Sequence, residues 1–420
     1  MYRDFENCRN LFTKAPSELT PRIRCNVKKN SLWPYQSQLR RRILQLLNFF
    51  LLISLFLPQL KRLYHVLGKD IDAVCMCIPP FLTIIGTILR NMVIDRFQSE
   101  IRSLLCQIKT EWDATSRREE NKILKNYASK AGEFSMVIAA VYFNVTICLT
   151  MAPIISPIMD IVLPRNETRM RYLGFELDYG IDQETYWFWI WLHSSTAGGF
   201  ITLNVLAADA MYVTLMFHGC YMFAIVRHRL VQINHLIRKN TARAFNNHDY
   251  NKKYTQRCEE RQLELQKQAI VIKQCVLSHK KAIECAQLLC HIYTWNLFIV
   301  AGVILIILSI SAVQLVSKLF QWAEMAIVIM YITGELINVF FLSLMAQYIF
   351  DHSLDVHEWA YSCSWYNMHA KIQKDIILIL MRSRLPCKIM AGKMFVMSLE
   401  NFCKTVQTSM SYFAVLVSFR

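Results

Sequence analysis

The feature that most constrains this chain is a series of apolar blocks, each about 18–25 residues long and nearly free of charged side chains. A helix of about 20 apolar residues crosses the ~30 Å hydrocarbon core of a bilayer. Because backbone polar groups must be satisfied inside lipid, a chain with several such blocks folds as a bundle of transmembrane helices. Hydrophobic residues make up 54% of the sequence, above the ~45–50% of soluble domains.

Seven blocks reach this length, so we predict an all-α membrane protein with seven transmembrane helices. The first 42 residues are polar and basic, and the first apolar block is followed by further blocks rather than by a cleavage site. No cleavable signal peptide is therefore expected. The predicted spans are residues 43–60, 74–94, 134–158, 187–226, 285–316, 322–350 and 395–419.

The Lys and Arg residues between the spans indicate an orientation. Of the 47 such residues, 37 lie in segments 1–42, 95–133, 227–282 and 351–393, and only 8 lie in the segments that alternate with them. Cytoplasmic loops carry the excess of positive charge. The sequence therefore predicts a cytoplasmic N-terminus and, because the number of spans is odd, an extracellular C-terminus. The formal charge of +16 is explained by these loops and does not require nucleic acid as a partner.

Two further features agree with this orientation. Asn166-Glu-Thr is a sequon for N-glycosylation in a predicted external loop, and none of the 14 cysteines lies in such a loop. Cysteines in spans and cytoplasmic segments stay reduced, so no structural disulfide is expected. Pairs such as His218 and Cys220 are better explained by helix packing than as metal ligands.

The cytoplasmic segments 96–130 and 227–284 are charged but carry apolar residues at helical spacing, such as Ile101, Leu104 and Ile108. We predict that the spans continue below the membrane as amphipathic helices, which must bury their apolar face. These helices either form a bundle or lie on the membrane surface. A bundle between subunits is the preferred interpretation.

The sequence contains no recognisable catalytic motif. It lacks a phosphate-binding Gly-rich loop, an HExxH pair and a G-x-S-x-G nucleophile turn, so we predict no enzymatic activity, no cofactor and no metal. The main carboxylates inside the spans are Asp209 and Glu335. Charge in a membrane span is costly, so each is a candidate functional residue, and a hydrogen-bonded structural role is the alternative.

The stretch Met394–Phe419 is MFVMSLENFCKTVQTSMSYFAVLVSF, which contains Ser-Leu near its beginning and Ser-Tyr-Phe-x-x-Leu near its end. It is similar to the last helix of insect odorant receptors. Residues 190–420 carry further motifs of that family in the same order, in a form associated with Hymenoptera, whereas the first 190 residues resemble it in layout only. These motifs are Asp209–Cys220, His279–Glu284, Gly334-Glu335-Leu336-Ile337, Ala360-Tyr361 and Ser364-Trp365-Tyr366.

The resemblance implies a ligand-gated, nonselective cation channel that serves sensory transduction in the plasma membrane of an olfactory neuron dendrite. The chain would be a tuning subunit that assembles with a shared co-receptor subunit into a heterotetramer. The implied domains are a cytoplasmic N-terminal segment (1–42), spans 1–4 with the ligand pocket (43–226), cytoplasmic anchor helices (227–284), spans 5–6 (285–350), a second anchor segment leading to span 7 (351–394) and the pore-lining span 7 (395–420).

In the family, the last helix lines the pore. Ser411, Val415 and Phe419 follow one helical line, which Thr408 and Ser418 flank. Ser and Thr hydroxyls can wet an ion path, whereas Val and Phe can narrow it and stop ions by dewetting. The resemblance implies that Val415 is a hydrophobic gate and that Phe419 is a second constriction. Because this helix has no ring of acidic residues, we expect weak selectivity among cations.

A pocket for a volatile ligand should be mostly aromatic and aliphatic, because shape and dispersion must supply the affinity. The resemblance and the helix spacing together place it between the outer halves of spans two, three, four and six. The candidate residues are Met76, Pro80, Phe81, Ile84, Val145, Cys148, Ala152, Leu203, Leu206, Ala210, Ile327 and Tyr331.

Three other classes of membrane protein remain as alternatives. A gustatory-type channel would share the architecture, but its last helix typically ends in Thr-Tyr-hydrophobic-Gln-Phe, from which the segment 411–416 departs. A G-protein-coupled receptor would have the opposite orientation and an Asp-Arg-Tyr-like exit from its third span. A secondary transporter would show internal repeats, which this sequence does not display.

Overall fold

The computed structural model describes residues 38–114, 118–162, 176–246, 254–317 and 322–418. The predictions for residues 1–37, for the sequon at Asn166 and for Phe419 fall outside these ranges. The elements are α3 (Gln38–Val66), α4 (Ile71–Arg96), α5 (Gln98–Ala114), α6 (Arg118–Val162), α7 (Trp187–Asn246), α8 (Tyr254–Ser317), α9 (Trp322–Ser362), the 3₁₀ turn η1 (Trp365–Asn367), α10 (Ala370–Ser383), β1 (Met390–Ala391), β2 (Phe395–Val396) and α11 (Leu399–Ser418).

Six helices of the described part are long and apolar enough to cross a membrane, by length and composition. They run over Arg42–Val66, Ile71–Arg96, Glu119–Val162, Trp187–Arg238, Arg261–Ser317 and Met325–Ser362. Each contains or overlaps one of the first six predicted spans, which confirms an all-α membrane fold. The seventh predicted span corresponds to α11, which is less apolar because it carries Glu400, Lys404, Gln407 and several Ser and Thr residues.

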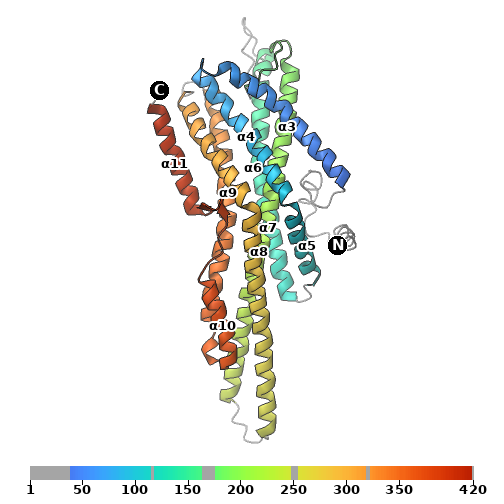
Figure 1. Cartoon of the computed structure of the whole chain (residues 1–420), viewed down its shortest axis with the longest axis vertical. Coiled ribbons are helices and arrows are strands. Elements are labelled where there is room, and N and C mark those ends of the chain that lie inside the picture. The colour runs from blue at the N-terminus through green and yellow to red at the C-terminus, as the bar shows by residue number, and fades with distance from the viewer. Residues whose placement is uncertain (1–37, 115–117, 163–175, 247–253, 318–321, 419–420) are drawn as a thin grey trace.

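The helices α7 and α8 are much longer than a membrane is thick. They contain 60 and 64 residues, and at ~1.5 Å per residue each is about three times as long as the hydrocarbon core. Their lower parts extend beyond the other spans, and α10 packs there against α8 and α9 (Figure 1). The amphipathic segments predicted to continue below the membrane are therefore helical, and they form a bundle within one chain.

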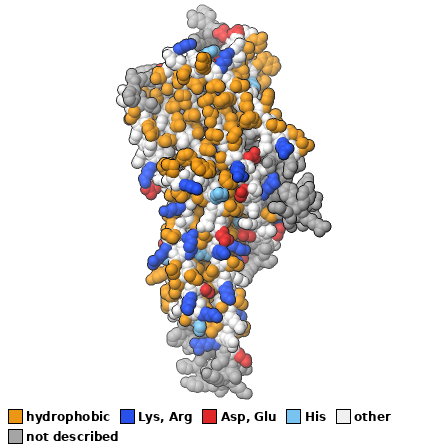
Figure 2. Space-filling model, in the orientation of Figure 1, with side chains coloured by type: hydrophobic (Ala, Val, Ile, Leu, Met, Phe, Trp, Pro, Cys, Tyr) orange, Lys and Arg blue, Asp and Glu red, His pale blue; other side chains and the backbone are white. Residues whose placement is uncertain are grey.

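Hydrophobic and basic side chains gather on different halves of the molecule along its long axis. Hydrophobic side chains cover the upper half of the visible face, whereas Lys and Arg gather mainly on its lower half (Figure 2). A hydrocarbon layer therefore fits around the upper half. Because positive charge is in excess on the cytoplasmic side, the lower half is that side. The C-terminal end of α11 points upwards, away from it, as predicted (Figure 1).

The helix α7 forms the centre of the bundle. Its side chains Tyr212 and Met216 are completely or almost completely buried. At Gly219, a Cβ atom would lie 3.1 Å from the side chains of both Leu289 on α8 and Ile349 on α9. The absence of a side chain at this position therefore lets the three helices approach closely.

A short antiparallel hairpin joins α10 to α11. Strands β1 and β2 pair across a turn in which Gly392 and Lys393 have φ of +59° and +60°, as in a type I′ turn. The N–H of Gly392 donates to the carbonyl oxygen of Thr294 on α8 at 2.9 Å. The hairpin thereby holds the beginning of α11 against α8.

Candidate ligand cavity and pore helix

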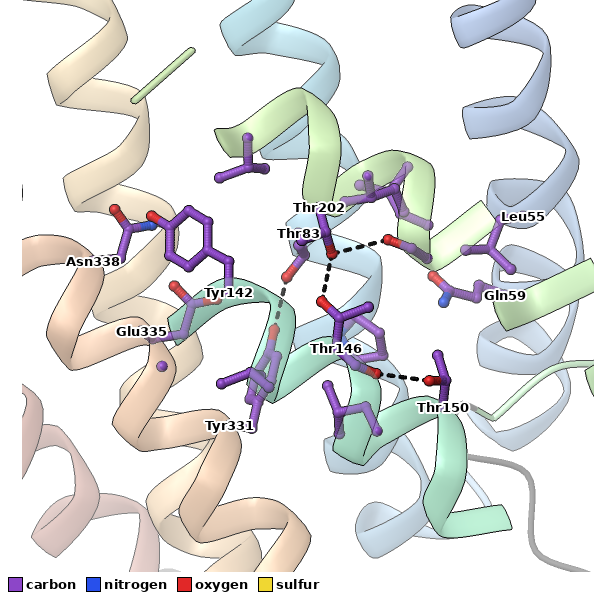
Figure 3. Close-up of a pocket in the computed structure, with 18 residues that line it drawn as sticks. Leu55, Gln59, Thr83, Tyr142, Thr146, Thr150, Thr202, Tyr331, Glu335 and Asn338 are labelled. Atoms are coloured by element: carbon purple, nitrogen blue, oxygen red, sulfur yellow. Dashed lines mark hydrogen bonds between the residues drawn. The ribbon is translucent and has the colours of Figure 1, made fainter. Parts of the chain in front are cut away.

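A cavity of about 150 Å³ lies between α3, α4, α6, α7 and α9 (Figure 3). Its accessible wall is mostly apolar, with polar groups at separate points. Such a lining suits a small, largely apolar molecule. The lining residues are Leu55, Gln59, Pro80, Thr83, Ile84, Tyr142, Val145, Thr146, Leu149, Thr150, Gly198, Ile201, Thr202, Val205, Tyr331, Gly334, Glu335 and Asn338.

Four of the predicted ligand-binding residues meet at this cavity. Pro80 and Ile84 line it from α4, Val145 lines it from α6, and Tyr331 lines it from α9. The fourth predicted span, α7, also contributes to the wall, but through neighbouring positions: Thr202 and Val205 line the cavity in place of the predicted Leu203 and Leu206. The assignment of these four residues to a ligand site remains a prediction.

The other eight predicted positions lie outside the lining of this cavity. Leu206 and Ala210 are buried on the core side of α7, whereas Cys148 and Leu203 are exposed on the outer surface of the bundle. Apolar residues occur at core-facing, lipid-facing and cavity-facing positions alike, so helical spacing alone does not separate these positions. The eight positions are Met76, Phe81, Cys148, Ala152, Leu203, Leu206, Ala210 and Ile327.

Sequence reasoning missed the contribution of the first span. Leu55 and Gln59 of α3 line the cavity, next to Pro58. The carbonyl oxygen of Pro58 accepts the N–H of Asp178, and Arg62 binds Glu176 at 2.9 Å, so the segment before α7 is tied to the end of α3. The available signal was Gln59 itself, a polar residue within an apolar block.

Hydrogen bonds between side chains connect the walls of the cavity. The hydroxyl groups of Thr83 on α4 and Tyr331 on α9 lie 2.7 Å apart, and those of Thr146 on α6 and Thr202 on α7 also lie 2.7 Å apart. The first pair joins helices that are distant in the sequence, and the second joins the consecutive helices α6 and α7. Because buried hydroxyl groups without partners are costly, these pairs favour one arrangement of the helices.

A buried ion pair adjoins the cavity. Arg90 of α4 binds one carboxylate oxygen of Asp209 on α7, and the hydroxyl group of Tyr142 donates to the other oxygen at 2.7 Å. Arg90 and Asp209 are 8% and 2% exposed, so each charge depends on the other. Asp209 is therefore paired and hydrogen-bonded, as a structural role would require, whereas Glu335 lines the cavity.

A second group of titratable residues lies on the cytoplasmic side. His218 Nε2 of α7 lies 3.7 Å from Glu111 Oε2 of α5, beside a cavity of about 50 Å³. Burial raises the pKa of Glu111 to about 7, and the positive charges of Lys281 and Arg229 offset only part of this rise. Among the described residues, no group of three or more His, Cys, Asp or Glu side chains could hold a metal ion.

The helix α11 presents one face to the bundle and leaves another uncovered. Ser409 is buried, and Phe402 packs edge-to-face on Phe340 of α9 with ring centroids 5.7 Å apart. On the opposite side Val415 is 51% exposed, and the other described residues of the predicted pore line are exposed too. These residues are Thr408, Ser411 and Ser418. Their exposure within one chain is the arrangement that a pore shared between subunits would require.

Known proteins share the sequence pattern of this chain. A family model described as 7tm Odorant receptor matches residues 70–410. Odorant receptor Or2 of Anopheles gambiae is 28% identical over 151 residues, which is 34% of this chain and 38% of that protein. Odorant receptor 10 of Aedes albopictus is 29% identical over 102 residues, which is 24% of this chain and 27% of that protein. The chain thus covers well under half the length of these curated relatives.

Two solved structures share its fold. The olfactory receptor OR5 of Machilis hrabei in complex with eugenol superposes with a TM-score of 0.74 at 14% identity, over 99% of this chain and 100% of that chain. A second structure of the same receptor gives a TM-score of 0.69 at 13% identity, with the same coverage. At such identities the likeness establishes the arrangement of the helices.

Proposed function

This chain belongs to the 7tm odorant receptor family, and we propose that it is a tuning subunit of an odorant-gated, nonselective cation channel. The observation that carries the proposal is that α9 lines the cavity and also contacts the last helix, α11. Tyr331 and Glu335 line the cavity, and Phe340, farther along α9, contacts Phe402 of α11. A ligand that shifts α9 would therefore shift α11.

Opening would follow from a difference in ligand affinity between two states. A ligand moves the equilibrium toward the open state only if it binds that state more tightly. At the wall of the cavity, the hydrogen bond between Thr83 and Tyr331 links α4 to α9. A small ligand inserted between these helices would change their separation, and α9 would pass the change to α11.

The uncovered face of α11 supports assembly with other subunits. Val415, Ser411 and Thr408 are exposed in a single chain, and a helix bearing them would line a pore at the centre of a tetramer. We propose that the other subunits include a co-receptor of the same fold. The assembly would be placed in the plasma membrane of a sensory dendrite, with cations passing along the Ser- and Thr-lined path.

The experiment that tests this function is expression with and without an odorant receptor co-receptor, followed by current recording over a panel of volatile compounds. We expect ligand-evoked cation current only when both subunits are present. Current from cells that express this chain alone would mean that it forms a homomeric channel and does not need a co-receptor. No current from any combination, with both subunits present at the cell surface, would argue against the proposal.

A further inference from the structure

Gln59 of α3 is a buried residue of the cavity wall whose polar atoms have no partner. Its side chain is 1% exposed, and among the described residues neither Nε2 nor Oε1 has a hydrogen-bond partner. The amide group points from α3 toward the side chains of Thr146 and Thr202 (Figure 3). Because both atoms lack a partner, the observation holds for either orientation of the amide group.

The hydroxyl groups that Gln59 faces are already engaged. Those of Thr146 and Thr202 are 2.7 Å apart, and the hydroxyl group of Thr150 donates to the carbonyl oxygen of Thr146 at 2.9 Å. A buried amide without a partner is unfavourable, so Gln59 requires a water molecule or a ligand group in the cavity. The volume of the cavity is sufficient for either.

A second acceptor of the same cavity is also without a partner. Asn338 of α9 is 9% exposed and lines the cavity, and its Oδ1 has no hydrogen-bond partner among the described residues. It lies across the cavity from Gln59 (Figure 3). The wall therefore offers two acceptor oxygens, Gln59 Oε1 and Asn338 Oδ1, and each requires a donor.

We propose that Gln59 is the polar anchor of this cavity and that the ligands are small alcohols and phenols. The inference rests on the proposed function and specifies its ligand class. A hydroxyl group can donate to Gln59 Oε1 or Asn338 Oδ1 and can accept from Gln59 Nε2, whereas an aldehyde, ketone, ester or ether can only accept. The apolar remainder of the wall suits a hydrocarbon body, since burial of that body is favourable.

The charges near the cavity exclude carboxylates as the ligand class. Glu335 lines the cavity, and its electrostatic neighbours are Arg90 and Asp209, which already form an ion pair. An anionic ligand would add a negative charge to a site in which two carboxyl groups face one guanidinium group. Repulsion between like charges is strong in a buried site of low dielectric constant, whereas a neutral hydroxyl group avoids it.

The first test uses the unmodified chain, co-expressed with a co-receptor. Hexanol, hexanal, hexyl methyl ether and hexane have similar hydrocarbon bodies and differ at the group that would meet Gln59. We expect hexanol to open the channel at a concentration about tenfold or more below those of the other three, because a site with unpaired acceptors rejects analogues that lack the donor. Equal potency of hexanol and the ether would overturn the inference.

The second test replaces the anchor. Gln59→Leu keeps a side chain of similar size but removes both polar atoms, so it should raise the half-maximal concentration of hexanol about tenfold and leave that of hexane unchanged or lower. The matched control is Thr333→Val. The hydroxyl group of Thr333 is exposed on α9 and donates to Ile329 O, so its loss should not alter the order of potency.

The outcomes separate this inference from the function on which it rests. If no compound evokes current with surface-expressed subunits, the proposed function fails. If compounds evoke current but Gln59→Leu shifts the half-maximal concentrations of hexanol and hexane equally, the proposed channel function is retained and the role of Gln59 as the polar anchor is refuted. Should Gln59→Leu not reach the surface, the comparison of hexanol with the ether on the unmodified chain still decides.

Discussion

At the scale of single residues, the charged side chains buried in this bundle can be replaced only at a cost that depends on their partners. Arg90 and Asp209 connect α4 to α7 in the membrane-spanning part of the protein, and Tyr142 completes the hydrogen bonding of the carboxylate. The desolvation of each charge is offset only while its partner is present. The effect of a substitution here depends mainly on the charge that it leaves behind.

We therefore expect Asp209→Asn to destabilise the protein by about 3–5 kcal/mol, because Arg90 is left buried without its counterion. Thermal unfolding of the purified protein in detergent measures the effect. The double substitution Arg90→Met with Asp209→Leu removes both charges and should recover most of the lost stability. Equal destabilisation by the single and double variants would contradict this account of the pair.

Glu111 gives the stability a pH dependence of known sign. Burial is the main cause that raises its pKa in the folded protein from the ordinary value of 4.5 to about 7. The folded state thus favours the protonated form, and this contribution to stability is full below about pH 4.5 and is lost as the pH rises through about 7. Glu111→Gln should match the parent near pH 4 and be more stable at pH 8, by on the order of 3 kcal/mol.

Thermal unfolding of both proteins between these pH values tests the prediction for Glu111. The control is Glu119→Gln, which removes a carboxylate that is 61% exposed on the neighbouring helix α6. Its curve should run parallel to that of the parent. Parallel curves for Glu111→Gln as well would mean that Glu111 titrates in the same way in the folded and unfolded chain.

The sequence predicted some of the residues that line the cavity and not others. Tyr331 and Val145 were found because they lie on the expected helices at the expected depth, and both are apolar or aromatic. Gln59 was missed because a glutamine in an apolar block carries no periodic signal. The partner of Asp209 was also missed, since Arg90 is more than 100 positions away in the sequence and only the packing of α4 on α7 brings them together.

At the scale of elements, hydropathy predicted the membrane-spanning cores of the helices, and the apolar periodicity of residues 227–284 predicted their helical continuation below the membrane, but neither signal gave the residue at which each helix ends. The fourth span was expected over 187–226, and α7 continues to Asn246. An apolar window detects the lipid-crossing part, whereas the cytoplasmic extension is amphipathic and is stabilised by packing against α8. The hairpin before α11 could not be predicted, because its two-residue strands are held mainly by contacts with α8.

The helix α11 gives the prediction that belongs to this scale. With Val415 as the gate, Val415→Ser should raise the current recorded without ligand several-fold, because a hydroxyl group keeps a narrow pore wet. Met410 is 60% exposed on another face of the same helix, so Met410→Ser is the matched control and should leave the resting current unchanged. A resting current that rises equally in both variants would mean that loss of packing, not gating, is responsible.

At the scale of the whole molecule, the apolar surface locates the membrane and the basic side chains give the orientation. The apolar surface covers one half of the long axis, and the basic side chains gather on the other half (Figure 2). The positive charges between spans show the same division in the sequence, with 37 Lys and Arg residues on one side and 8 on the other. Because translocation of basic loops is unfavourable, the long ends of α7 and α8 stay in the cytoplasm.

This orientation predicts which parts of the chain an antibody can reach on intact cells. An epitope tag after Arg420 should be labelled without permeabilisation, whereas a tag before Met1 should be labelled only after it. A tag inserted between α7 and α8, within residues 247–253, is the internal control and should behave like the N-terminal tag. Labelling of the N-terminal tag on intact cells would mean that the chain has the opposite orientation in the membrane. It would also place the cavity on the cytoplasmic side of the membrane, where an external odorant could not reach it directly.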